Sequence, residues 1–93
     1  MKEIEVLLKR LPLSQLESHI CVSIDGEKIY IDGFKGAVSK EKTGPTAATI
    51  YISQKNLLDV LSGEGSAISL FARGDIEIDG NLTVAFKLKD LFG

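Results

Sequence analysis

The hydrophobic pattern of the chain changes near residue 20 from helical spacing to strict alternation. Before that point apolar residues recur every three or four positions, which predicts an amphipathic helix over residues 3–19. Pro12 has no backbone N–H to donate, so this helix should break near its middle. The apolar positions of the helix are Ile4, Leu7, Leu8 and Leu11.

Five alternating runs predict five strands. Three of them lie between residues 20 and 39 and are separated by Asp25-Gly26 and Asp32-Gly33, dipeptides typical of tight turns. These three runs predict an antiparallel meander, the third strand running from Phe34 to Val38. After a polar loop, a fourth run covers residues 48–52 and a fifth covers residues 75–79.

Three further helices are predicted around the last two strands. Ser53 and Ser66 have the chemistry of helix N-caps, and Gly63 and Gly74 suit helix ends because glycine tolerates positive φ. Residues 82–92 form the last helix, directly after the fifth strand. The first of these helices carries one apolar face made of Leu57, Leu58 and Leu61.

The last helix has an apolar surface wider than one contact needs. With successive residues about 100° apart, its apolar side chains cover well over half of the circumference, whereas a single docking surface needs a stripe only slightly wider than about 100°. A second apolar contact is therefore expected, with another helix, another subunit or a bound apolar ligand. The apolar positions are Leu82, Val84, Ala85, Phe86, Leu88, Leu91 and Phe92.

Composition and charge exclude several classes of protein. The 93 residues, 44% hydrophobic and 26% charged, suit one folded domain over residues 1–93. A net charge of −2 without a basic cluster disfavours nucleic-acid binding. No apolar run is long enough for a membrane span or a signal peptide. Because Cys21 is the only cysteine and no peroxisomal targeting signal is recognisable, we expect a cytoplasmic protein.

The side chains that carry chemistry do not form a catalytic set. His19 is the only histidine, so a Ser-His-Asp triad, a Cys-His pair or a multi-histidine metal site cannot form within the chain. We expect His19 to be solvated near a helix end and Cys21 to fill space on the strand face away from the core. Residues 75–80 resemble half of a calcium loop, but its bidentate position is Phe86. No catalytic residue, metal ligand or cofactor is predicted.

The second half of the chain resembles the sterol carrier protein 2 (SCP-2) sterol-binding domain family, of which it would be a short, single-domain member. The resemblance rests on the strand and short helix of residues 49–64, the apolar turn of residues 67–72, the Gly74-Asp75-Ile76-Glu77-Ile78-Asp79-Gly80 strand and the final helix. The order and spacing of the glycines and of the apolar positions agree with the family. The first half agrees in outline, as a helix followed by a strand meander.

The resemblance implies an α+β fold, with a five-stranded, mainly antiparallel sheet covered on one side by helices. Between the two layers it implies an elongated apolar cavity that takes sterols, fatty acids or fatty acyl-CoA, and for which we expect roughly 300–1,000 Å³. Lys87 and Lys89 either meet a carboxylate or phosphate at the mouth or lie on a solvated helix face. The lining candidates carried over are Leu57, Leu61, Phe71, Leu82, Phe86 and Leu91.

Chain length narrows the expected ligand. A chain shorter than typical members has less surface to enclose a sterol, which favours a single fatty acyl or isoprenoid chain. The missing peroxisomal signal favours a bacterial or archaeal source. We therefore expect noncovalent binding of an apolar ligand, with or without transfer and without catalysis.

An interaction module is the main alternative. The same apolar surface could dock a partner enzyme, as an accessory factor handling quinone-like intermediates would, or a second copy in a homodimer; transient contact with a membrane is also open. A concentration-dependent dimer without ligand uptake would favour this alternative. A hydrolase or acyltransferase is disfavoured because His19 is the only candidate base.

Overall fold

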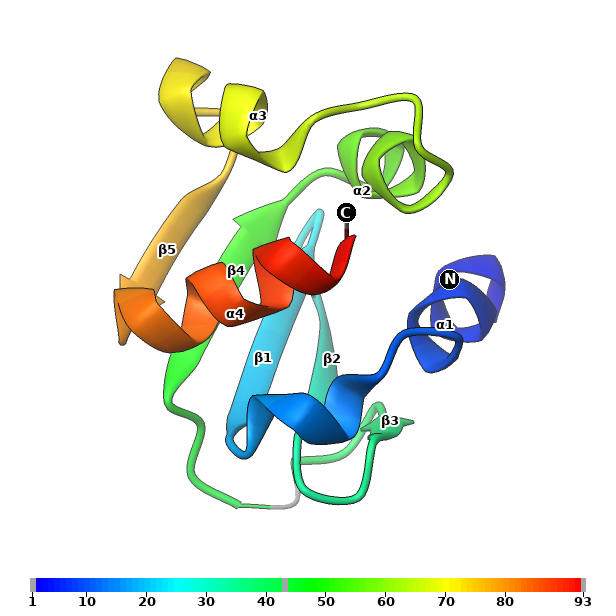
Figure 1. Cartoon of the computed structure of the whole chain (residues 1–93), viewed down its shortest axis with the longest axis vertical. Helices are drawn as coiled ribbons and strands as arrows, with labels where there is room; N and C mark the ends of the chain where they lie inside the picture. Colours follow the sequence, from blue (N-terminus) through cyan, green and yellow to red (C-terminus); the bar gives the residue numbers. More distant parts are fainter. Residues whose placement is uncertain (1, 43, 93) are drawn as a thin grey trace.

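The computed structural model describes residues 2–42 and 44–92 and shows one mixed sheet with helices on one of its faces (Figure 1). The Pro12 break is confirmed, since a helix and a short 3-10 turn replace the single helix of residues 3–19. Along the chain the elements are α1 (Lys2–Lys9), η1 (Leu13–Leu16), β1 (His19–Ile24), β2 (Glu27–Asp32), β3 (Ala37–Ser39), β4 (Ala48–Ile52), α2 (Gln54–Leu61), α3 (Ala67–Arg73), β5 (Glu77–Gly80) and α4 (Leu82–Phe92).

The sheet has the order β3-β2-β1-β4-β5. The predicted meander of the first three strands is confirmed, and β5 pairs antiparallel with β4. One pair, β1 with β4, is parallel, so the sheet is mixed. β4 lies on the opposite side of β1 from β2, which leaves β1 in the centre of the sheet (Figure 1).

One row of branched apolar residues crosses the sheet beneath the helices. Val22 of β1 is paired with Ile29 of β2 and with Ile50 of β4, and Ile50 is paired with Ile78 of β5. Because side chains alternate between faces, this pairing sends the whole row to the helical side. The helices bury their own apolar residues against the row: Ile4, Leu8, Leu13, Leu16, Leu57, Val60, Leu70, Val84, Ala85 and Leu88.

The third strand is shorter than predicted because its first predicted residues form a turn instead. The Asp32 carboxylate accepts backbone hydrogen bonds from Phe34 at 2.9 Å and from Lys35 at 3.0 Å. Gly36, at φ +74°, donates to the Asp32 carbonyl oxygen at 2.8 Å and completes the turn. The backbone hydrogen bonds from Lys35 and then Phe34 hold the pKa of Asp32 below its ordinary value. Phe34 is therefore an exposed turn residue.

His19 begins β1 and is partly buried, so the expectation of a solvated residue at a helix end is wrong. Glu17 adopts a left-handed conformation with φ 51° that ends η1, and the chain then enters the strand directly. The imidazole ring packs against Phe34 with a centroid distance of 5.4 Å. Its Nδ1 atom lies 3.9 Å from a carboxylate oxygen of Asp32.

The face of the sheet away from the helices carries small residues at its centre. Cys21 and Ser23 project there, and both are buried, with exposed fractions of 4% and 6%, respectively. Cys21 is paired with Tyr30 on β2 and Thr49 on β4. Burial raises the pKa of the Cys21 thiol above its ordinary value. The predicted role of Cys21 as a space-filler on this face agrees with the structure.

No helix among residues 2–42 and 44–92 has both the length and the apolar character that crossing a membrane requires.

Among the described glycines, Gly33 leaves the least room for a Cβ atom. Its N–H donates to the Ser18 carbonyl and its own carbonyl accepts from Glu17. A Cβ there would overlap the Ser18 carbonyl oxygen and lie 2.8 Å from the Leu16 Cβ.

Gly33→Ala should lower the free energy of unfolding by about 3 kcal/mol in urea titrations, because the added Cβ clashes with this backbone. Gly26, at φ +87° with open space around it, is the control; its alanine variant should lose about 1 kcal/mol. Equal losses would contradict the predicted clash.

Cys21 should be unreactive in the folded protein. Because the thiol is buried and its pKa is raised, a thiol reagent at pH 8 should modify it on the order of 100-fold more slowly than in urea-unfolded protein. Stopped-flow or spectrophotometric labelling measures both rates. Similar rates in the two states would contradict the burial of this side chain.

Candidate functional site: an apolar pocket between the helices and the sheet

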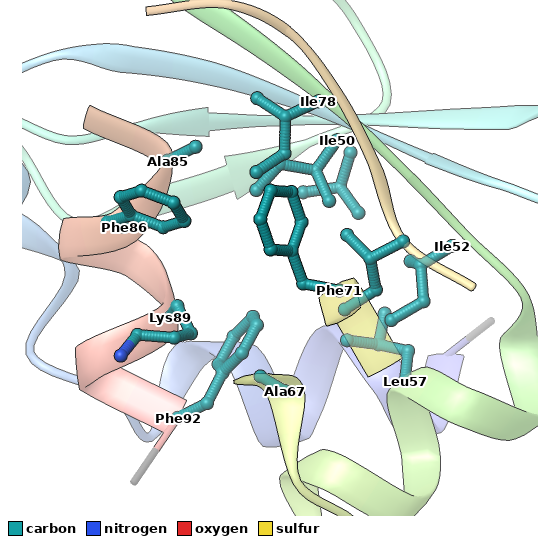
Figure 2. A pocket seen from close by; sticks show the side chains of 12 residues that line it. Ile50, Ile52, Leu57, Ala67, Phe71, Ile78, Ala85, Phe86, Lys89 and Phe92 are labelled. Atoms are coloured by element: carbon teal, nitrogen blue, oxygen red, sulfur yellow. The ribbon is translucent and has the colours of Figure 1, made fainter. Parts of the chain in front are cut away.

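A strongly apolar pocket lies between the inner face of the sheet and helices α2, α3 and α4 (Figure 2). Eleven of the twelve residues lining it are apolar, and the twelfth is Lys89. The sheet supplies the floor, and the three helices supply the walls. The lining residues are Val22, Ile50, Ile52, Leu57, Ala67, Phe71, Ile76, Ile78, Ala85, Phe86, Lys89 and Phe92.

Burial distinguishes the inner end of the pocket from its mouth. Val22, Leu57 and Ala85 are almost completely buried, so they form the inner end. Phe71 is 36% exposed, and Phe86, like Ala67, Lys89 and Phe92, is half-buried. These partly exposed residues come from α3 and α4, so the mouth lies between those two helices.

Aromatic side chains close the mouth. The rings of Phe71 and Phe86 meet edge to face, with centroids 5.6 Å apart and planes at 89°. Such a pair contributes about 0.5–1.5 kcal/mol beyond the area it buries. Figure 2 shows the Phe71 ring reaching from α3 toward Ile50 and Ile78, where it occupies the centre of the pocket.

The free volume inside is about 30 Å³, far below the 300–1,000 Å³ expected for a lipid cavity. The expectation fails because the phenylalanine rings turn inward and fill the space that a ligand would take. At about 24 cal/mol per Å³, the remaining 30 Å³ costs only about 0.7 kcal/mol. The closed form is therefore well packed without a ligand.

Three of the six lining candidates meet in this pocket. Leu57, Phe71 and Phe86 come from α2, α3 and α4 and all line it. Their convergence from three helices makes the pocket the best candidate for a functional site.

The other three candidates lie elsewhere. Leu61 packs against the core, partly buried, without lining the pocket. Leu82 is 49% exposed at the start of α4. Leu91 faces the opposite side of α4, in a shallow groove shared with Leu16. In α4 it is Ala85, Phe86, Lys89 and Phe92 that face the pocket.

The sheet residues of the pocket were not among the candidates. Ile50, Ile52 and Ile78 line it together with Val22, and Ile76, directly before β5, lines it as well. Their signal was present, because strand alternation places Val22 and Ile50 on the same face as the residues that the helices cover. A lining set built from helix residues alone therefore misses the floor of the pocket.

The two lysines of α4 have different surroundings. Lys89 lines the pocket, and its Nζ atom lies 2.8 Å from a carboxylate oxygen of Asp90. Lys87 is exposed and lies beside Leu91 in the groove on the other side of the helix. Of the two, only Lys89 can reach a group at the mouth of the pocket.

α3 is the helix least anchored to the core. It buries Leu70, whereas α1 and α2 each bury two residues and α4 buries three. Gly63 precedes it and Gly74 caps it, both with φ +82°. Two glycines in left-handed conformations let the backbone bend on either side of the helix.

Metal ligands are not clustered in the described structure. Among residues 2–42 and 44–92, no group of three or more His, Cys, Asp or Glu side chains is placed to hold a metal ion.

Solved structures share this fold. The chain is similar to the sterol carrier protein domain 2 of Helicoverpa armigera, with a TM-score of 0.78, 22% identity, and coverage of 98% of this chain and 83% of that one. It is similar to sterol carrier protein-2 of Aedes aegypti, solved in complex with palmitate, at a TM-score of 0.77 and 16% identity over 98% and 92% of the two chains. A ubiquinone synthesis protein, UbiJ-SCP2, gives a TM-score of 0.67 and 18% identity over 99% and 94%.

Comparison of sequences gives the family. None of the curated proteins matches the chain. Residues 4–93, nearly the whole chain, match the SCP-2 sterol transfer family. The resemblance found in the second half of the sequence thus extends through the first half, including the strand meander. The chain belongs to the SCP-2 sterol transfer family.

Proposed function

We propose that this protein binds a single-chain apolar lipid noncovalently in the pocket between the sheet and helices α2, α3 and α4. The observation that carries the proposal is the lining, in which eleven of twelve residues are apolar. Burial of a hydrocarbon chain against such a lining is favourable by about 0.8 kcal/mol per methylene group. The proposal includes no catalytic step, because the lining carries a single ionisable side chain, Lys89, and no second group that could act with it in general acid–base or nucleophilic catalysis.

The size of the pocket favours a thin ligand. A fatty acyl or isoprenoid chain can replace one or two phenylalanine rings in the pocket, whereas a rigid sterol nucleus needs several walls to move together. The Aedes aegypti relative was solved with palmitate, a C16 fatty acid, which is a ligand of this shape. Palmitate is therefore the first probe to use.

Entry of a chain requires the mouth to widen, and α3 is the wall that can move. It borders the mouth through Ala67 and Phe71, it buries little, and glycines flank it. Outward movement of α3 would separate the Phe71 ring from Phe86. We infer that the closed structure is the ligand-free state and that the ligand holds the two rings apart.

An accessory role is the second candidate. Ile68 on α3 is 55% exposed and Leu82 on α4 is also exposed, so each helix that borders the mouth carries an unpartnered large apolar side chain. A partner enzyme that receives the lipid could dock there. That one structural relative is a ubiquinone synthesis protein supports this second candidate.

Filling the mouth should block uptake. Ala67→Phe places a ring where the ligand must pass, so the affinity for palmitate should fall about tenfold or more. Ala72, exposed on the same helix and outside the lining, is the matched control, and Ala72→Phe should bind as wild type does. Native mass spectrometry and the palmitate-induced rise in Tm measure binding. Equal binding by both variants would place the site elsewhere. Absence of any palmitate or isoprenoid uptake by the wild type would refute lipid binding.

Local opening of α3 should be visible without a ligand. Amide hydrogen exchange in residues 67–73 should be at least about tenfold faster than in residues 82–92, since α3 buries one residue and α4 buries three. Hydrogen exchange with mass spectrometry resolves the two helices. Equal protection of α3 and α4 would argue that the mouth opens by another movement.

A further inference from the structure

We propose that Lys89 anchors the head of the ligand and selects single-chain amphiphiles that carry one anionic group, with the hydrocarbon chain directed inward from α4. This inference rests on the proposed function and makes it more specific. It specifies which end of the ligand lies at the mouth of the pocket, and it gives one side chain a specificity-determining role.

The position of Lys89 suits an anchor at the mouth. Its stem lies between Phe86 and Phe92 on α4, and its nitrogen points away from the apolar side chains (Figure 2). Lysine commonly lays its methylene stem on apolar surface while keeping its ammonium in water. A ligand whose tail fills the pocket would therefore place its head beside this ammonium group.

The present partner of Lys89 can be exchanged at small cost. Asp90 lies 2.8 Å from the ammonium, but its side chain is 70% exposed. Ion pairs between exposed side chains contribute little to stability, so a ligand carboxylate can take the place of Asp90, which then returns to water.

The rest of the lining offers no competing partner. Lys89 is the single charged residue among the twelve, and no other lining side chain carries a hydrogen-bonding group. A neutral alcohol head could accept a hydrogen bond from the Lys89 ammonium but would not neutralise its charge, and a cationic head would be repelled by it. The pocket therefore distinguishes ligands by the charge of the head, while the tail is recognised by burial alone.

The test compares heads on one tail. Palmitate, hexadecyl phosphate and hexadecanol are titrated into wild-type protein, Lys89→Met and Lys87→Met, with displacement of the neutral dye Nile red as readout. Methionine keeps an apolar stem and removes the charge. Lys87 is the control, because it lies on the same helix and outside the pocket.

For wild type we expect palmitate to bind about tenfold more tightly than hexadecanol. Lys89→Met should lose this preference and keep the affinity for hexadecanol, while Lys87→Met should behave as wild type. If hexadecyl phosphate also binds about tenfold more tightly than hexadecanol, the selectivity extends to single-chain anions in general. If it binds no more tightly than hexadecanol, the selectivity is restricted to carboxylates. Raised salt should weaken palmitate binding in the wild type more than in Lys89→Met.

Two results would overturn the assignment while leaving lipid binding intact. If Lys89→Met keeps the preference for palmitate over hexadecanol, the head lies elsewhere. If Lys89→Met loses affinity for both ligands equally, the stem of Lys89 has only a packing role. Displacement of Nile red by none of the three ligands from the wild type would instead refute the proposed function, and the anchor with it.

Discussion

The register of the central strand is the constraint on which the rest of this structure depends. β1 pairs with β2 on one side and with β4 on the other, so its alternation determines the inward face of three strands at once. A slip of one residue would turn Val22 outward and bring Cys21 and Ser23 beneath the helices. The floor of the pocket would then lose its branched side chains, and the helices would lose the surface against which they pack.

Local signals explain why so much of the secondary structure could be predicted. The Ser53 hydroxyl accepts a hydrogen bond from the backbone of Asn56 at 3.1 Å, and Ser66 caps α3 in the same way. Gly74 ends α3 in a left-handed conformation. Each of these interactions spans three or four residues, so the sequence pattern alone contains it. Alternation does not predict the shortening of β3, because the carboxylate of Asp32 competes with the strand for backbone N–H groups.

The site was harder to predict, because its composition depends on how helices turn relative to the sheet. α4 is apolar around most of its circumference, so periodicity did not favour Phe92 over Leu91 or Ala85 over Leu82 as a lining residue. Tertiary packing decides this rotation: Leu88 is buried in the core, which turns Ala85 and Phe92 toward the pocket. The closed state of the pocket depends on the directions of the phenylalanine side chains, for which the sequence carries no signal.

The contact between Phe71 and Phe86 gives the pocket a threshold for chain length. Separating the rings removes a favourable contact and exposes aromatic surface before any ligand is buried, so this free energy must be offset by the tail. Burial of each methylene group contributes about 0.8 kcal/mol of favourable free energy, so the first few groups of a tail only offset the cost of opening the pocket. Short acids that are abundant in metabolism would stay excluded, even with a suitable head, and long chains would be retained. The aromatic contact between two helices would thus act as a length filter.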